Sequence, residues 1–174
     1  GLMKHAEALT SITCSTVNSY NGLVPRVGGF EGGTVTWAPT NITYGHNNRS
    51  AQFRLPQNRY CIENRAADMT MNVYLAFSMT LAAAVEGIKM KIHPGKPTDQ
   101  DLYNMTDKEF KKLGIKRLPR NLLMALEALK NDKLSDEVIG TVMKNSLLAY
   151  KNDEWERYHQ AVTDWEVKEY LRLY

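Results

Sequence analysis

The chain has 174 residues, of which 43% are hydrophobic, and a formal net charge of +3 at pH 7. That is enough apolar material for one globular core, and so small a charge argues against a nucleic-acid partner or an anionic membrane surface. The two cysteines, Cys14 and Cys61, are typical of a reducing compartment and give no metal-binding spacing. The longest apolar run, 73–85, is too short to span a membrane and does not resemble a signal peptide. We therefore expect a soluble, cytoplasmic protein.

The first 48 residues predict one helix, one strand and two loops. Residues 1–9 predict a helix, since apolar residues recur there at helical spacing, and the histidine inside it, His5, is predicted to be structural. The glycine-rich segment 26–33 is either a mobile surface loop or a loop that approaches a ligand closely, because glycine permits both. Alternation and β-branching predict a strand over 34–38, and 40–48 is predicted to be a loop.

The segment 47–77 is rich in charged residues and then becomes apolar. Its charged residues are Arg49, Arg54, Arg59, Glu63, Arg65 and Asp68. The alternation in 50–55 predicts a strand with Gln52 and Arg54 on one face, and 61–65 predicts a second strand. The arginines can form ion pairs on a solvated sheet face, or they can form an anion site, since guanidinium matches carboxylate and phosphate oxygens. Composition alone favours the solvated face.

The C-terminal part is predicted to be helical. Residues 71–91 are apolar on most sides and predict a buried helix that backs the sheet. A short helix is predicted over 106–113, followed by helices over 121–129, from Ser135 onward and over 141–150. The last predicted helix covers 153–174, and its aromatic side chains, which recur at three-four spacing, are predicted to lie in the core.

The order of several short motifs resembles the C-terminal half of the glutamine synthetase catalytic domain. The chain reads NRSA, RLP, ENR and NVYLAF, where that family typically reads NRSA-x-x-R-[IL]-P, E-x-R-x-x-D and N-P-Y-L-A-F. The resemblance begins at the first helix and continues to the last residue. It implies an α+β fold, with antiparallel strands of a partial barrel backed by the buried helix and a helical C-terminal region. It also implies that residues 1–174 are one C-terminal part of a longer polypeptide.

The same resemblance implies an enzyme that uses ATP and Mg²⁺ or Mn²⁺ to join an amine to the γ-carboxyl of glutamate. The implied roles are as follows: Arg49 contacts the transferring phosphoryl group, Arg54 and Arg59 the nucleotide, Glu63 the metal, Arg65 the glutamate, and Glu31 the amine. The full-length protein is expected to be a ring-shaped homo-oligomer, and this chain alone is expected to be inactive. A non-catalytic helical module that binds an acidic partner is the alternative from another class.

Three positions depart from the family pattern and bear on the choice of amine. Gly22 stands where an arginine usually holds the substrate α-carboxylate, and Cys61 and Asn47 stand where two further arginines are usual. Arg26 is the nearest cation that can replace the first of these. The departures resemble the branch that includes γ-glutamylmethylamide synthetase, so we expect methylamine as the acceptor, with ammonia and ordinary glutamine synthesis as the alternative.

Overall fold

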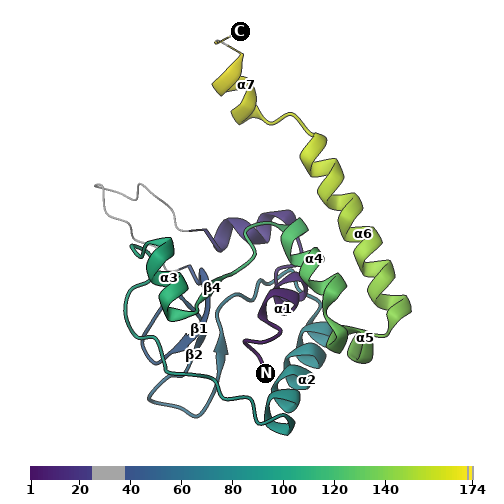
Figure 1. The fold of residues 1–174 in the computed structure, drawn as a ribbon. Coiled ribbons are helices and arrows are strands. Elements are labelled where there is room, and N and C mark those ends of the chain that lie inside the picture. Colours follow the sequence, from purple (N-terminus) through teal and green to yellow (C-terminus); the bar gives the residue numbers. More distant parts are fainter. Residues whose placement is uncertain (25–37, 172, 174) are drawn as a thin grey trace.

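The computed structural model describes residues 1–24, 38–171 and 173. Their elements, in chain order, are α1 (Ala6–Thr13), the 3-10 helix η1 (Val17–Gly22), β1 (Asn41–Gly45), β2 (Ala51–Arg54), β3 (Glu63–Asn64), α2 (Val73–Lys89), α3 (Asp107–Leu113), β4 (Lys116–Arg117), α4 (Leu122–Asn131), α5 (Lys133–Ile139), α6 (Thr141–Gln160) and α7 (Asp164–Tyr170). Figure 1 shows α1, α2 and α4 gathered beside a small sheet, while α6 leads away from them to α7. The predicted α+β class is confirmed.

The described strands form an open four-stranded sheet in the order β3-β2-β1-β4. Two of its three pairings, β2 with β3 and β1 with β4, are antiparallel as predicted. The third, between β1 and β2, is parallel, although only residues 46–50 connect the two strands. The chain therefore doubles back along β1 before β2 begins, and we call this connection the hook.

The strand predictions were right for β2 and wrong for β1. Ala51–Arg54 forms β2 within the predicted 50–55, and the second predicted strand is limited to Glu63–Asn64. The predicted loop 40–48 instead contains β1, because this segment hydrogen bonds to a strand on each side and is mostly buried. The predicted strand 34–38 lies outside the described residues except for its last one.

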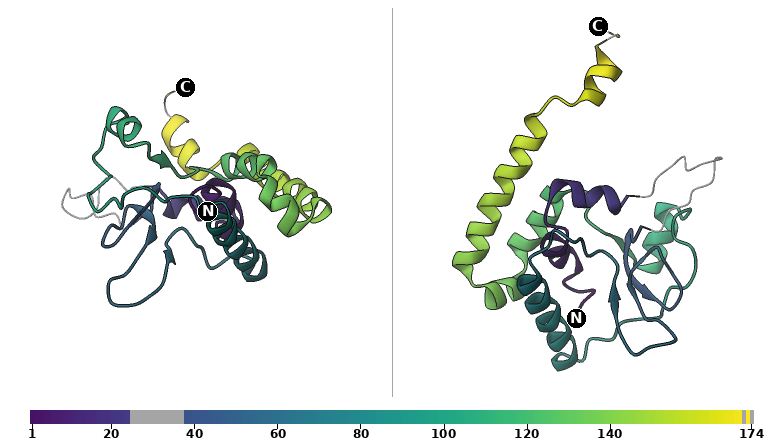
Figure 2. Two further views of the ribbon diagram at one scale, coloured as in Figure 1. Left: turned by 60° about the horizontal axis from the view of Figure 1, so that its bottom comes forward. Right: turned by 180° about the vertical axis from the view of Figure 1, so that it is seen from behind.

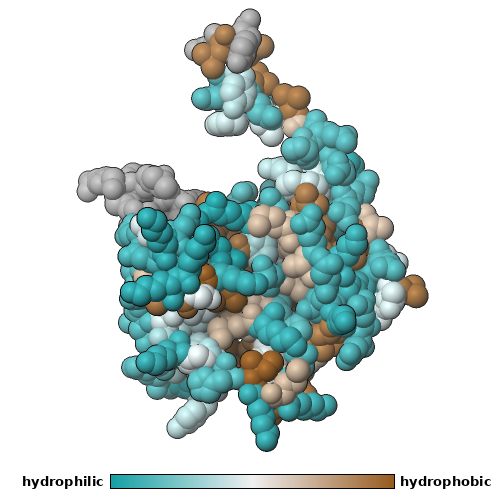
Figure 3. All heavy atoms as spheres, in the orientation of Figure 1, coloured by the Kyte–Doolittle hydropathy of each residue, from teal (hydrophilic) through white to brown (hydrophobic). Residues whose placement is uncertain are grey.

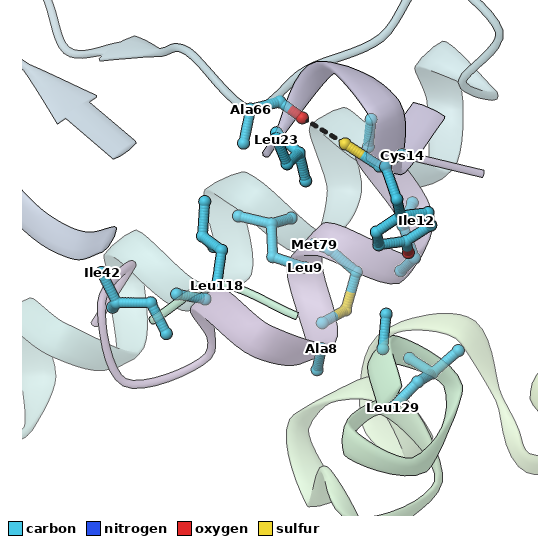
Figure 4. Packing of buried hydrophobic residues seen from close by; sticks show 14 of the residues in the cluster. Ala8, Leu9, Ile12, Cys14, Leu23, Ile42, Ala66, Met79, Leu118 and Leu129 are labelled. Atoms are coloured by element: carbon cyan, nitrogen blue, oxygen red, sulfur yellow. Dashed lines mark hydrogen bonds between the residues drawn. The ribbon is translucent and has the colours of Figure 1, made fainter. Parts of the chain in front are cut away.

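Helix α1 lies at the centre of the core. It begins five residues and ends four residues later than predicted. It extends past Leu9 because the hydroxyls of Thr10, Ser11 and Thr13 donate to carbonyls within the helix and so tolerate burial. Figure 4 shows Leu9 beside Met79 of α2, and Leu118 between the helices and Ile42 of β1. Burial of such side chains is the main favourable term in folding, so α1 fixes the helices to the sheet.

Helix α2 is buried on one side only, which corrects the predicted all-round burial. Its buried residues, Ala76, Met79, Ala83 and Gly87, follow one helical stripe. An apolar stripe on another side is exposed, and it comprises Tyr74, Phe77, Leu81, Val85 and Ile88. Because both stripes of α2 are apolar, the sequence shows no amphipathic pattern that would distinguish them. In the structure, the described residues pack against only one of the two stripes.

The short helices begin at polar caps. Thr106 and Glu109 form a capping box at the start of α3, and Asn121 caps α4, both close to the predicted starts. The prediction that Ser135 begins a helix was wrong by two residues. Asp132 caps α5 instead, because its carboxylate accepts a hydrogen bond from the Ser135 amide at 2.8 Å.

Helix α6 and helix α7 form an arm that extends from the body, as the right-hand view in Figure 2 shows. The predicted break near 151–152 is absent, and the break falls at 161–163, where Thr163 and Glu166 form a capping box. The aromatic stripe was predicted to be core, but only Trp155 is partly buried against the body. Figure 3 shows apolar side chains exposed around α7. No described helix is long and apolar enough to cross a membrane.

A buried ion-pair network joins three helical regions at His5, the residue before α1. His5, which is 6% exposed, places Nδ1 2.5 Å from the carboxylate of Asp132 and Nε2 2.7 Å from that of Glu86 on α2. Each ring nitrogen is thus within hydrogen-bond distance of one carboxylate oxygen, so His5 links the two acidic side chains. Lys4 pairs with the other oxygen of Glu86 at 2.8 Å. The predicted structural role of His5 is consistent with these contacts.

Candidate anion-binding site

Three of the predicted site residues, Arg54, Glu63 and Arg65, lie on one face formed by β2 and its antiparallel neighbour β3. Arg54 is directly opposite Glu63, and the Arg65 amide donates to the carbonyl of Gln52 at 2.8 Å, which continues the register by one pair. Opposed residues of an antiparallel pair point to the same side, and so do residues two apart. Gln52, Arg54, Glu63 and Arg65 therefore share one face, while Phe53 points to the core.

Glu63 is the carboxylate on which two arginines converge. Nη1 of Arg54 lies 3.3 Å from its Oε2, and Nη2 of Arg59 lies 3.6 Å from the same oxygen. Glu63 is 35% exposed and Arg59 62% exposed, so these long contacts are screened by water and hold the groups weakly. An incoming anion can therefore take either guanidinium from Glu63 at small cost.

Arg65 and Arg49 are brought together through the main chain. Nη1 of Arg65 donates to the carbonyl of Arg49, which sits in the hook. Burial lowers the pKa of Arg65, while Tyr103 and Glu63 nearby raise it and the Arg49 and Arg54 charges lower it again. Arginine stays protonated despite such a fall, so the face carries several fixed positive charges close together.

The hook is held in place by the segment 98–100. The Asn48 side chain donates to the carbonyls of Thr98 and Gln100 at 2.7 and 2.9 Å and accepts from the Ser50 amide at 2.8 Å. Asp99 accepts from the amide of His46 at 2.6 Å and lies 3.0 Å from its Nδ1, contacts that lower the pKa of Asp99. These bonds fix the backbone from which Arg49 projects.

Arg54 is also tied to the hook. Its Nε donates to the carbonyl of His46 at 3.3 Å, while its Nη1 reaches Glu63. The Arg54 guanidinium thus links the hook to Glu63 on β3. No local pattern pointed to Asp99, because its contact with His46 joins residues 53 positions apart.

The remaining predicted residues divide into those outside the described residues and those exposed on the surface. Arg26 and Glu31 belong to the first group. Gly22, Asn47 and Cys61 are exposed, which fits positions where side chains can face a site. A Cβ built on Gly22 would meet no atom of the described residues within 4 Å, so these residues leave room there for a longer side chain.

As a metal site, the described residues are incomplete. Glu63 offers a half-exposed carboxylate whose Oε1 is not engaged by any described residue, which suits one ligand position of a hard cation. Within 1–24, 38–171 and 173, no three histidine, cysteine, aspartate or glutamate side chains converge to hold a metal ion. Glu63 therefore fits as one ligand among others that would have to come from elsewhere.

The same face carries a buried amide, that of Gln52, which the sequence pattern did not predict. Alternation places Gln52 beside Arg54, but nothing in the pattern shows that it is fully buried. Leu102, whose amide donates to the Ser50 hydroxyl, brings a distant segment against the residue that precedes β2. Tyr103 follows it, and its hydroxyl donates to the Ala38 carbonyl at 2.7 Å.

Comparisons with known proteins give one consistent family. A family model described as the glutamine synthetase catalytic domain matches residues 1–170. The glutamine synthetase of Methanocaldococcus jannaschii is 41% identical over 174 residues, and the glutamate–methylamine ligase of Methyloversatilis universalis is 42% identical over 174 residues. These alignments cover 98% and 100% of this chain but 36% and 38% of those proteins, so the chain spans less than two-fifths of their length.

Solved structures resemble the whole described fold. A structure named GmaS/ADP complex, conformation 1, matches with a TM-score of 0.82 at 33% identity and covers 98% of this chain and 38% of that one. A structure named apo GmaS without ligand matches with a TM-score of 0.76 at 32% identity, with 98% and 36% covered.

Proposed function

The chain belongs to the glutamine synthetase catalytic-domain family, and from that premise we propose that it is the C-terminal part of an ATP-dependent glutamate–amine ligase. The observation that carries the proposal is the single sheet face on which Arg54, Glu63 and Arg65 lie, with Arg49 joined to it through the hook. Such a face suits two anionic substrates, a nucleotide and an amino acid. A helical module that binds an acidic partner would not require a carboxylate between the arginines.

The chemistry explains why cations gather there. A carboxylate oxygen is a poor leaving group, so the γ-carboxyl of glutamate first takes the γ-phosphoryl group of ATP and releases ADP. An amine then attacks the acyl carbon and releases phosphate. Both steps develop charge on phosphate oxygens, and fixed positive groups lower the barrier by stabilising that charge. We assign Arg49 to the transferring phosphoryl group, and Arg54 and Arg59 to the nucleotide phosphates.

The other assignments follow the substrate end of the face. Arg65 would hold glutamate, which fits its partly buried charge, since a desolvated guanidinium binds a carboxylate more strongly. Glu31 would receive the proton of the amine, and Arg26 would support the α-carboxylate. Glu63 would contribute one ligand to Mg²⁺ or Mn²⁺, which supplies charge neutralisation on the phosphates when bound.

We further propose that the amine is methylamine. The support is the missing cation at Gly22, Asn47 and Cys61, together with the 42% identity to a glutamate–methylamine ligase and the resemblance to GmaS structures. Ordinary glutamine synthesis stays the second candidate because a glutamine synthetase is 41% identical. We also propose that the complete protein is cytoplasmic and forms a ring-shaped homo-oligomer. The number of subunits can be measured by mass photometry.

The test uses the complete native polypeptide. ADP release that depends on both glutamate and an amine is measured for ammonia, methylamine and ethylamine. We expect methylamine to have the highest kcat/KM, by about 10-fold or more over ammonia, since one methyl group in a fitted pocket is worth roughly 1–3 kcal/mol. Preference for ammonia would refute the amine assignment, and absence of glutamate-dependent ADP release would refute the ligase. Residues 1–174 expressed alone are expected to show only background activity.

A further inference from the structure

Gln52 is a buried amide without hydrogen-bond partners on the candidate site face. It is 0% exposed, and neither its Nε2 nor its Oε1 has a partner among the described residues. A primary amide offers two donors and two acceptors, and leaving them unpaired away from water costs free energy. Buried polar groups in native proteins are nearly always paired, so an exception of this kind requires a reason.

The hook shows that this chain can satisfy a buried amide fully. Asn48, which is 5% exposed, uses its side-chain oxygen and nitrogen in hydrogen bonds to Ser50, Thr98 and Gln100. Gln52 lies four residues further on and within the sheet, where its backbone carbonyl is already bonded to the Arg65 amide. An apolar residue of similar size would fill this position without the unpaired groups. Retention of the amide is therefore not explained by the described packing.

The register identifies the neighbour through which Gln52 can act. Gln52 is directly opposite Arg65, and both side chains point to the face that carries Arg54 and Glu63. In the structure, Nη1 of Arg65 donates to the carbonyl of Arg49. When the Arg65 guanidinium turns toward a substrate carboxylate, its remaining N–H groups need a hydrogen-bond acceptor that fixes the orientation of the guanidinium plane. The Gln52 side-chain oxygen is a neutral acceptor on the opposing strand.

We propose that Gln52 is a positioning residue that accepts a hydrogen bond from the Arg65 guanidinium when glutamate occupies the site. The inference rests on the proposed role of Arg65 and deepens it. In this arrangement the ligand-free protein carries the cost of an unpaired amide, and ligand binding removes that cost. Gln52 touches no substrate, because it is fully buried, and it acts only through the orientation of Arg65.

The test replaces Gln52 by Met, which is apolar and similar in length. In the complete native protein, Gln52→Met should raise the KM for glutamate about 10- to 100-fold, the effect of one hydrogen bond to a charged group, and change kcat much less. It should also raise the midpoint of thermal unfolding of the ligand-free protein by roughly 2–4 °C, because unpaired buried groups are removed. Gln52→Leu serves as a second variant if Gln52→Met does not fold.

Tyr20 supplies the matched control. Its hydroxyl is also buried without a partner among the described residues, but it belongs to η1 and lies in the core cluster. Tyr20→Phe should raise thermal stability similarly and leave the KM for glutamate unchanged. An equal effect of Tyr20→Phe and Gln52→Met on KM would overturn the inference, since it would show a general response to core changes.

A double-mutant cycle with Arg65→Lys separates positioning from a structural effect. If Gln52 acts through Arg65, the two changes together raise the KM for glutamate by much less than the product of the single effects. Multiplicative effects would overturn the inference. If the wild type releases no ADP but glutamate still raises its unfolding temperature, only the ligase proposal fails, and the same variants are compared by that temperature shift. Absence of both responses overturns the two proposals together.

Discussion

The buried His5 network gives a prediction whose size follows from the contacts. His5→Leu preserves most of the volume but leaves the carboxylates of Asp132 and Glu86 without the hydrogen-bond partner that they share. The Asp132 contact is the more buried, at 11% exposure, and losing a hydrogen bond to a charged group there costs roughly 1.5–3 kcal/mol. Glu86 is 24% exposed and keeps its ion pair with Lys4, so losing its contact with His5 should cost only about 0.5–1 kcal/mol of folding free energy. We expect a total of about 2–4 kcal/mol.

The assay is urea unfolding followed by far-UV circular dichroism, with His46→Leu as the control. His46 also pairs with one carboxylate, that of Asp99, but both side chains are 40% or more exposed, so its loss should cost less than about 1 kcal/mol. Asp132→Asn retains a capping side chain for α5, and combined with His5→Leu it should cost less than the sum of the two single changes. Equal losses for His5→Leu and His46→Leu would refute the reasoning.

Three further predictions use the carboxylates and the cysteines. Glu63→Gln keeps the side-chain shape but removes the anion, so in the complete protein metal-dependent turnover should fall at least about 100-fold with the fold retained, and wild-type rates at low Mg²⁺ would contradict the metal assignment. The pKa of Glu86 is held below its usual 4.5 mainly by Lys4 and His5, so its contribution to stability is present above pH 4.5 and is lost as the pH falls through the lowered value. Glu86→Gln should therefore flatten the acid side of the stability profile in urea titrations. Burial raises the pKa of Cys14 to about 12 while Cys61 is exposed, so a thiol reagent at pH 8 should label Cys61 at once and Cys14 only after unfolding, and equal labelling rates in the folded protein would contradict the described burial.

Local patterns predicted the elements whose cause is local. The alternation in 50–55 predicted β2, and the polar residues before each short helix marked where α3 and α4 begin. The shared face of Arg54 and Glu63 was not predictable from spacing alone, because it depends on the register of β2 with β3. In the same way, β1 was missed because two strands from elsewhere in the chain make it a strand.

Long-range contacts decided the rest. His5 was predicted to be structural, but its partners Glu86 and Asp132 lie 81 and 127 positions away. The uniform apolar content of α2 could not show which stripe this chain covers. Alternation places Gln52 on the outward face of β2, whereas the structure buries it completely. Each of these outcomes depends on which segment packs over a residue, and a single sequence contains no direct record of that.

The hook has a consequence for chain length. Ala51 lies beside Asn41, so the chain must travel from Gly45 back past four residues of β1, a straight-line distance of about 14 Å at roughly 3.3 Å per residue and one strand spacing. Six residue steps of up to about 3.5 Å reach roughly 21 Å, which leaves only enough excess for the two reversals of direction. Deleting two residues from 46–50 would remove that excess and pull Arg49 off its position, whereas an inserted residue would leave the strand register intact and merely move the arginine. The number of residues in the hook, as much as their chemistry, thus determines the position of the Arg49 guanidinium relative to the sheet.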